Sequence, residues 1–159
     1  MSVVVPPKGT RGTGFPAIAR RIMRATLGSS VAAFRMLGDR MRVQGRPLLL
    51  LTTVGRRSGK PRETLLGWFP DEGADTYLVT ATAAGSADHP AWFLNLASHP
   101  DQVWVEVGRR RRRVTPVSLE GAERDAAWER IVALAPGYAP YRAKTDRVIP
   151  IVRLIPTQG

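Results

Sequence analysis

Apolar and polar positions along most of the chain follow the short-period pattern of β-strands. Residues 48–54 form a run of leucines, threonines and valine that is too short for an ordinary helix and predicts a buried strand. Residues 102–107 place valine at every second position, which predicts a strand with one buried face. Pro150 lies in the last of the other predicted strands and indicates an edge or a bulge there. These other strands are expected at residues 63–69, 77–82, 110–117 and 148–155.

Apolar spacing with the helical period occurs in fewer places. Residues 91–97 predict a largely buried helix, with Pro90 in its first turn and His89 beside its cap. Residues 120–134 predict a second helix, and a short helical turn follows at 138–144. The inward side chains of the helix at 120–134 are expected to include Ala122, Ala126, Ile131 and Leu134.

The N-terminal part of the chain has a basic helical pattern. One or two amphipathic helices are expected between residues 15 and 37, with Gly-Ser-Ser at 28–30 interrupting the pattern. A helix packed on the domain with a solvated arginine face fits this pattern, and so does a helix lying on an anionic membrane. The apolar face contains Phe15, Ile18, Ile22 and Ala25, and the basic face contains Arg20, Arg21 and Arg24.

The order of these elements predicts the fold class. Helices are too few and too unevenly placed for a doubly wound parallel sheet. An α+β fold is therefore expected, with a mostly antiparallel sheet or small barrel and helices packed at the barrel ends. Residues 1–46 are expected to form a loose arm and the basic helical segment, and residues 47–159 the barrel domain.

Composition adds a strong positive charge to this picture. Lys and Arg number 24 against 13 Asp and Glu, and the net charge of +11 attracts nucleic acid, anionic lipid or a polyanionic small molecule. No RNA-recognition, helix-turn-helix or zinc-finger pattern accompanies this charge, so nucleic acid is not expected as a partner. The lack of cysteine excludes disulfides and thiolate metal sites. The sequence also lacks a secretory signal pattern, which predicts a cytoplasmic protein.

Several of the cations lie in the sequence Gly-Arg-Arg-Ser-Gly-Lys-Pro-Arg at residues 55–62, between two predicted strands. Glycine allows a tight turn that exposes amide groups to an anion, and arginine binds phosphate or carboxylate through paired hydrogen bonds. The loop is not a nucleotide P-loop, because its spacing differs and a strand follows it. A cradle for a phosphate-bearing ligand and a solvated hairpin tip both remain open.

Other candidate chemistry is sparse. The run of arginines at 109–113 must point to both faces of its predicted strand, and either a solvated edge or contacts with lipid or nucleic-acid phosphates would explain it. His89 and His99 each precede a proline at a helix end and are expected as caps rather than bases. No nucleophile elbow or set of metal ligands is present, and no metal is expected. An enzyme of this kind would depend on a bound cofactor for its reactivity.

Three motifs, taken together, resemble the deazaflavin-dependent nitroreductase family. They are Leu-Leu-Thr-Thr-Val-Gly-Arg-Arg-Ser-Gly-Lys-Pro-Arg at 50–62, His-Pro-Ala-Trp-Phe-Leu-Asn-Leu at 89–96 and Thr-Asp-Arg-Val-Ile-Pro-Ile-Val at 145–152. The resemblance implies a split β-barrel that binds reduced coenzyme F420. It also implies that the hydride of this coenzyme passes to a quinone, a nitroaromatic compound or a similar small-molecule acceptor.

The resemblance also implies roles for individual residues. Arg56, Arg57 and Arg62 would hold the phosphate and oligoglutamate tail of the coenzyme, with Ser58 and Lys60 in the same loop. The other implied cofactor-binding residues are Thr64, Leu65, Gly85, Pro90, Trp92 and Asn95. The implied catalytic residues are Thr82, beside the reacting ring, and Tyr138 and Tyr141, at the acceptor site.

Two positions depart from the family pattern. Ala83 stands where the family often has a lysine, and Ala135 where it often has a tyrosine. A second interpretation therefore stays open, a non-catalytic split-barrel protein that binds a flavin, a haem or a fatty acyl chain. The basic N-terminal helix is similar to segments that keep some members on the membrane. This similarity implies peripheral contact with the inner face of the cell membrane, whereas the oligomeric state is not indicated.

Overall fold

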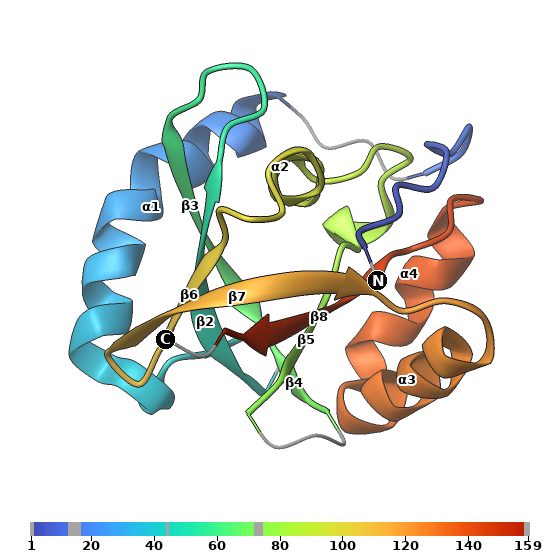
Figure 1. Ribbon diagram of the computed structural model, residues 1–159. Coiled ribbons are helices and arrows are strands. Elements are labelled where there is room, and N and C mark those ends of the chain that lie inside the picture. The colour runs from blue at the N-terminus through green and yellow to red at the C-terminus, as the bar shows by residue number, and fades with distance from the viewer. Residues whose placement is uncertain (1, 13–16, 44, 72–74, 158–159) are drawn as a thin grey trace.

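The structure is a computed structural model that describes residues 2–12, 17–43, 45–71 and 75–157. Eight strands form one sheet in which every recorded pair is antiparallel (Figure 1). The strands are β1 Arg42–Val43, β2 Arg46–Val54, β3 Pro61–Gly67, β4 Phe69–Pro70, β5 Tyr77–Thr80, β6 Trp104–Val107, β7 Arg110–Ser118 and β8 Ile151–Pro156. The expected α+β class with a mostly antiparallel sheet is thus confirmed.

The sheet curls into a barrel because one segment belongs to both of its ends. Hydrogen-bonded neighbours follow the path β2-β6-β7-β8-β5-β4, and β3 pairs with the free side of β2. β3 and β4 are separated only by Trp68, so the extended segment 61–70 pairs first with β2 and then with β5. The predicted single strand at 63–69 is therefore two strands with a break at Trp68.

β2 lies between two apolar layers, which explains its nearly continuous apolar sequence. Leu49 and Leu51 point into the barrel, where they pack with Phe93 and Leu96. Leu48 and Leu50 alternate with them and point to the opposite face, beneath the first helix. Burial on both faces requires apolar residues at successive positions rather than at every second one.

Four helices surround the barrel within the described residues. They are α1 Ala17–Leu37, α2 Ala91–Ser98, α3 Gly121–Leu134 and α4 Ala139–Lys144, with short 3₁₀ turns η1 Gly38–Arg40, η2 Ala83–Gly85 and η3 Pro136–Tyr138. Figure 1 shows α1 along one side of the barrel, α3 and α4 on the opposite side, and α2 over one end. None of these helices has both the length and the apolar character that crossing a bilayer requires.

The first helix differs from its prediction in one respect. α1 runs without a break through residues 28–30, because Leu27, Val31 and Phe34 continue one apolar face across Gly28 and pack on β2 and β3. A helical glycine costs only about 1 kcal/mol, which such packing offsets. The side chains predicted to form the apolar and basic faces of residues 15–25 lie outside those that the structure describes.

Two other predictions about helix and strand faces are wrong. In α3, Ile131 is buried as predicted, but Ala122 and Ala126 are exposed and Leu134 is half exposed; the other buried residues are Ala127 and Trp128. The buried face contains the large Trp128 ring together with Ala127 and Ile131. β8 is not an edge strand, because it pairs with both β5 and β7, and Pro150 precedes its first residue.

The segment expected to be a loose arm lies along the domain and is held by hydrogen bonds. The Gly9 N–H donates to the Ala87 carbonyl at 2.8 Å, and the Val4 N–H donates to Ser118 Oγ at 2.9 Å. The amides of Thr10 and Arg11 donate to Asp146 Oδ1 at 2.8 and 2.9 Å. Residues 2–11 therefore belong to the packed structure and reach the same region as residues 145–147.

The arginine run at 109–113 is paired on one side and largely exposed, because β8 pairs with β7 only from Val114 onwards. β7 pairs with β6 at residues 110–113 and with β8 at residues 114–118. Arg109 sits at the β6–β7 turn with a φ of 65°, and its guanidinium donates to the Arg35 and Met36 carbonyls at the end of α1. The Arg111 guanidinium lies 5.2 Å from the centre of the Trp104 ring. Part of the run thus joins α1 to the sheet.

Candidate functional site

The loop between β2 and β3 is closed by its own backbone. The Gly55 N–H donates to the Lys60 carbonyl at 2.8 Å, and the Gly59 N–H donates back to the Gly55 carbonyl at 2.9 Å. The Lys60 N–H donates to Ser58 Oγ at 3.2 Å. Gly59 has a φ of 68°, and a Cβ on Gly55 would lie 2.5 Å from Ser58 Oγ. The positive φ at Gly59 favours glycine, as the sequence predicted, and a side chain at Gly55 would displace the Ser58 hydroxyl.

Four cations of this loop have no partner among the described residues. The side chains of Arg56, Arg57, Lys60 and Arg62 are exposed, and none forms an ion pair or side-chain hydrogen bond with a described residue. Their neighbour Glu63 instead lies 3.8 Å from Arg35 of α1. The charge of the loop is thus available to a polyanionic ligand, and this donor set fits a phosphate-bearing and carboxylate-bearing cofactor.

A buried asparagine fixes the loop relative to α2. Asn95 is 6% exposed, and its Oδ1 accepts a hydrogen bond from the Arg56 N–H at 3.1 Å. α2 itself is anchored because Phe93 and Leu96 are fully buried inside the barrel. Pro90 is the N-cap of α2 and not a residue of its first turn, where the sequence predicted it. Asn95 thus ties the loop to α2, and its contact with a ligand stays a prediction.

The residues expected to line the ring pocket are divided between two faces. Thr64 pairs with Leu51, whereas Leu65 pairs with Leu50 and packs against the cluster under α1. Because neighbouring strand residues point to opposite faces, Thr64 is on the barrel side and Leu65 on the α1 side. The Trp92 ring is partly buried against the barrel core, next to Phe93.

A second cluster surrounds the turn at residues 81–86, which contains Thr82 and Gly85. Arg147, 5% exposed, donates from Nε to the Ser86 carbonyl at 3.0 Å. Its two terminal nitrogens donate to the carbonyls of Ala81 and Thr82, each at 2.9 Å. Burial lowers the pKa of Arg147, although its pKa starts so high that the guanidinium stays charged. One buried cation thus holds three carbonyls of the turn.

His89 connects this cluster to the N-terminal segment and does not cap α2, contrary to the prediction. Its Nδ1 lies 3.2 Å from an Arg147 nitrogen, which can only donate, so Nδ1 accepts. Nε2 therefore carries the proton and donates to the Pro6 carbonyl at 2.7 Å. Burial, and to a smaller extent the Arg147 charge, lower the pKa of His89 and favour the neutral ring. His99 does lie at the C-cap of α2, as expected.

Asp146 forms the other tie to the N-terminal segment. Its carboxylate accepts hydrogen bonds from the Thr10 hydroxyl and from the amides of Thr10 and Arg11. The Thr10 hydroxyl contributes most to lowering the pKa of Asp146 to about 2. Thr145 Oγ1 also donates to the Arg11 carbonyl, at 2.7 Å.

The two tyrosines expected at the acceptor site have different surroundings. Tyr138 is buried, and its ring meets Phe69 edge-on with centroids 5.3 Å apart; burial raises the pKa of its phenol. Tyr141 is partly exposed, and the Lys144 ammonium lies 5.6 Å from its ring centre. A Cβ on Gly85 would lie 2.8 Å from Lys144 Cβ, so this part of α4 packs directly on the turn. The Tyr141 backbone is therefore near Gly85, while the Tyr141 ring packs at the margin of the core under α3 to which Tyr138 belongs.

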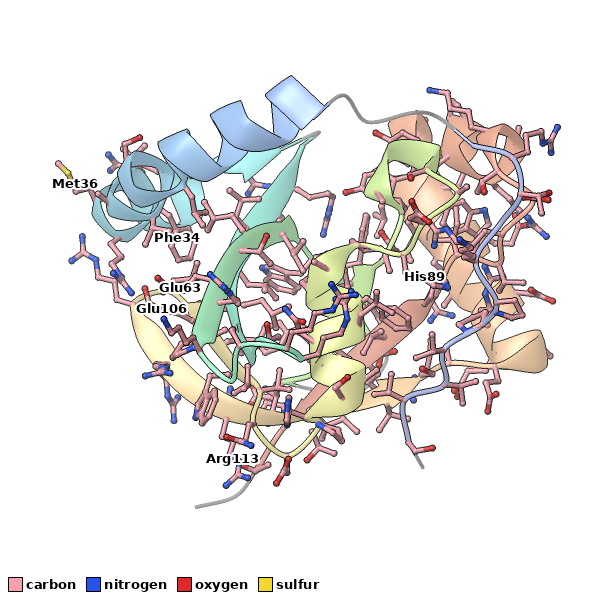
Figure 2. The ribbon with its side chains drawn as sticks, turned by 90° about the horizontal axis from the view of Figure 1, so that it is seen from above. Phe34, Met36, Glu63, His89, Glu106 and Arg113 are labelled. Carbon is pink, nitrogen blue, oxygen red and sulfur yellow. The ribbon has the colours of Figure 1, made fainter. Side chains whose placement is uncertain are left out.

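The clusters lie on either side of α2. Figure 2 shows α2 between the β2–β3 hairpin and the region of His89 with the N-terminal segment. The sequence singled out residues 145–152 as a motif but assigned no role to Asp146 or Arg147. A charged pair directly before an apolar strand was the available signal. Among the described residues no three His, Asp or Glu side chains gather as metal ligands. The arrangement can bind and orient an anionic ligand, but any redox chemistry must come from that ligand.

Comparison with known proteins gives consistent results. The sequence model of the family described as F420H(2)-dependent quinone reductase matches residues 27–156. An F420H(2)-dependent quinone reductase of Mycobacterium tuberculosis is 36% identical over 111 residues, which cover 68% of this chain and 72% of that protein. A solved F420-H2 dependent reductase, FDR-A, is 36% identical with a TM-score of 0.60, covering 72% of this chain and 98% of that one. A second structure, described as a domain-swapped dimer, is 31% identical with a TM-score of 0.61, covering 84% and 98%.

Proposed function

The chain belongs to the F420H(2)-dependent quinone reductase family, a family of oxidoreductases with a split-barrel fold, and on this basis we propose its reaction and its site. The protein binds reduced coenzyme F420 and transfers a hydride to a quinone, a nitroaromatic compound or a similar acceptor. The observation that supports this proposal best is the β2–β3 loop, whose four exposed cations have no partner in the described chain. A coenzyme with a phosphodiester and a glutamate tail supplies the missing negative charges.

The proposed division of labour follows from the placement of the residues. Arg56, Arg57, Lys60 and Arg62 hold the anionic part of the coenzyme, and Asn95 keeps the loop in register with α2. Thr64 and Trp92 contact the ring from the barrel side. Leu65 remains a proposed contact only at its backbone, because its side chain packs under α1. The bound coenzyme supplies the hydride, and the protein contributes position and electrostatics.

The turn at 81–86 and α4 form the proposed reacting end. Thr82 and Gly85 lie in the turn, and Tyr141 extends from the part of α4 that packs on it. Hydride transfer requires donor and acceptor atoms about 3–3.5 Å apart, so these elements act by holding the acceptor against the ring and excluding water. Tyr138 packs against Tyr141, since the two ring centroids lie 5.6 Å apart.

The direct experiment is a titration of the purified protein with coenzyme F420, followed by fluorescence, and then oxidation of the reduced coenzyme by a soluble naphthoquinone. We expect saturable binding at or below tens of micromolar and quinone-dependent oxidation. A protein that shows no binding in this range would contradict the proposal. Binding without turnover, with copurified flavin, haem or lipid, would favour the non-catalytic interpretation instead.

We also propose that the C-terminal end of α1 contacts anionic membrane. The apolar face near this end is buried on the sheet, but Met36 is 77% exposed and Leu37 48% exposed. Arg40 and Arg109 are exposed at the same end, and Figure 2 shows Met36 pointing away from the body of the protein. Apolar tips surrounded by cations suit the boundary of an anionic bilayer.

Vesicle sedimentation tests this contact. The wild type is expected to bind phosphatidylglycerol vesicles more than phosphatidylcholine vesicles, and the double variant Met36→Ser/Leu37→Ser is expected to lose most of that binding. Leu134→Ser is the matched control, because Leu134 is also half exposed but ends α3 on the opposite side of the barrel. Equal binding by all three proteins would contradict the proposal.

A further inference from the structure

The N-terminal strap, residues 2–12, lies along the domain without forming a helix or a strand. Near its beginning the Val4 N–H donates to Ser118 Oγ at 2.9 Å. Val3 is partly buried against the barrel core, whereas Val4 and Val5 are 43% and 46% exposed. Hydrogen bonds, more than burial of apolar surface, therefore hold this part of the strap, and segments of that kind open at a low cost in free energy.

His89 holds the middle of the strap through its ring (Figure 2). Its Nε2 donates to the Pro6 carbonyl at 2.7 Å, and its Nδ1 accepts from Arg147 Nη1 at 3.2 Å. The Arg147 guanidinium is fixed in place, because it also binds three carbonyls of the turn at 81–86. The strap is thus joined to a buried cation through one imidazole ring, and only the neutral form of that ring has the acceptor that this arrangement needs.

Protonation of His89 removes this acceptor. Both ring nitrogens then donate, so Nδ1 and Arg147 Nη1 present hydrogens to each other, and two like charges face each other across 3.2 Å. The carboxylate of Asp88, which is exposed, favours the charged ring instead. The imidazolium is therefore expected to turn from Arg147 towards Asp88, and the Pro6 carbonyl then loses its donor.

Charged groups from two segments act on His89, namely Arg147 ahead of β8 and Asp88 in the same loop as His89. α2 contributes the uncharged Phe93 ring, whose centre lies 5.3 Å from that of His89, and the strap contributes two backbone carbonyls. Burial is the main cause that lowers the pKa of His89, and the Arg147 charge lowers it further, while the carbonyls and Asp88 oppose both. The closed strap therefore favours the neutral ring.

We propose that residues 2–9 form a pH-sensitive part of the strap, which neutral His89 holds closed and protonated His89 releases. In the released state His89 is exposed and has the ordinary histidine pKa of about 6.5, above its pKa in the closed state. Release therefore begins as pH falls below about 6.5 and is complete once pH has fallen through the lowered pKa of the closed state. The strap is closed at neutral pH, and its release does not depend on the proposed reaction.

Residues 10–12 are the hinge of this motion. Asp146 accepts hydrogen bonds from the amides of residues 10 and 11, and its pKa of about 2 keeps the carboxylate charged throughout the range in which histidine titrates. The strap ahead of the hinge is one wall of a groove of about 200 Å³, which Val148 and Pro150 also line. Release thus opens this groove while the chain stays attached at Asp146.

Measurement of ¹⁵N relaxation on the coenzyme-free protein, at about pH 7.5 and about pH 5.5, tests the release. The Val4 amide is the reporter, because its acceptor, the Ser118 hydroxyl, does not titrate in this range. Its order parameter is expected to fall from about 0.85 to below about 0.6, whereas the Thr10 and Val114 amides stay near about 0.85. Val114 reports on the core, since it is 1% exposed and its N–H donates to the Val103 carbonyl at 2.9 Å.

Three results would contradict the proposal. A Val4 order parameter that is the same at both pH values would overturn the release. An equal fall at Val114 would also overturn it, because the whole fold rather than the strap would then be opening. An equal fall at Thr10 would overturn the hinge.

The chain contains two histidines, and each is tested as the source of the pH dependence. His89→Gln does not titrate in this range and is expected to abolish the change at Val4. His99→Gln, at the C-cap of α2, is the matched control and is expected to keep it. Asp88→Asn removes the carboxylate that favours the charged ring and is expected to shift the midpoint of release to lower pH. A change at Val4 that persists in His89→Gln, or disappears in His99→Gln, would assign the release to another group and overturn the proposal.

Discussion

The two clusters beside α2 present positive charge in opposite ways. The β2–β3 loop is made by residues close in sequence, its backbone closes on itself, and its cations extend into solvent. The Arg147 cluster joins residues 2–11, the turn at 81–86, His89 and residues 145–147, and its guanidinium is buried. One cluster is local and open, and the other is long-range and closed.

This difference predicts that the loop cations serve ligand binding and that the Arg147 cluster serves the stability of the fold. An exposed cation without an intramolecular partner contributes little to stability, so it can be selected for its ligand alone. A buried guanidinium that binds three carbonyls contributes to stability, because its removal leaves two of them, those of Ala81 and Ser86, unpaired. We therefore expect substitutions in the loop to change affinity, and substitutions around Arg147 to change stability and the shape of the turn together.

The largest effect is expected from Arg147→Met, which keeps the length of the side chain but removes every hydrogen bond. The Ala81 and Ser86 carbonyls are left unsatisfied, whereas the Thr82 carbonyl keeps the Gly85 N–H; two such groups at about 1.5 kcal/mol each predict a loss of about 3 kcal/mol in the free energy of unfolding. For a chain of this size that corresponds to a melting temperature lower by roughly 10 °C. Differential scanning calorimetry measures it.

Arg142→Met, an exposed arginine on α4, is the control and should melt within about 2 °C of wild type. If Arg147→Met and Arg142→Met have the same melting temperature, the Arg147 cluster does not stabilise the fold. The proposed difference in stability between this cluster and the β2–β3 loop would then be wrong.

Arg62→Ala should show the reverse behaviour. Loss of one charge-assisted contact predicts coenzyme binding weaker by about tenfold, with the free energy of unfolding within about 0.5 kcal/mol of wild type. Arg56→Ala is expected to behave in the same way. Arg110→Ala removes the same charge from the exposed part of β7 and should leave affinity within about twofold. Affinity that falls equally in all three variants would indicate a general field rather than a clamp.

Asn95→Ala tests the one long-range tie of the loop. The Arg56 N–H is left to water, which predicts a stability loss of about 1 kcal/mol. The loop also loses its fixed position relative to α2, so the affinity for the coenzyme, measured by fluorescence titration, should fall about fivefold. Ser98→Ala, exposed at the end of the same helix, serves as control. Wild-type affinity in Asn95→Ala would show that the loop keeps its shape without α2.

The smallest effect is expected from Asp146→Asn. The folded-state pKa of Asp146 is lowered to about 2, so its carboxylate stabilises the fold above the unfolded pKa of about 4. This stabilisation is lost as pH falls from about 4 towards about 2. Thermal melts of wild type and variant should therefore differ slightly at neutral pH and converge near pH 2. If the melting temperatures of wild type and variant still differ near pH 2, the charge of Asp146 is not what holds residues 10–11.

The sequence predicts most elements of the fold because their apolar periods are local. Residues 48–54 and 91–97 were placed correctly as buried strand and helix, and both loop glycines were identified from turn chemistry. Errors arose where tertiary packing decides. Trp68 breaks one predicted strand into two because the segment changes partner from β2 to β5. In α3, alanine is compatible with both a buried and an exposed position, and burial of the large Trp128 side chain determined which face of the helix packs on the barrel.

The candidate site divides in the same way. The charge and the turn of the β2–β3 loop could be predicted from eight consecutive residues, since no distant contact is needed to form them. The faces of Thr64 and Leu65, the burial of Tyr138 and the hydrogen bonds of His89 could not, because each depends on which element lies opposite.

By itself, then, the sequence determined the strand-rich α+β class, the cationic loop and the resemblance that the family comparison confirmed. Only the tertiary structure decided that an arginine in an unassigned motif would be buried against three carbonyls of the turn at 81–86. The physical reason is the range of the interactions. A turn and a strand follow from neighbouring side chains, whereas a buried charge is stable only where distant segments bring it enough acceptors.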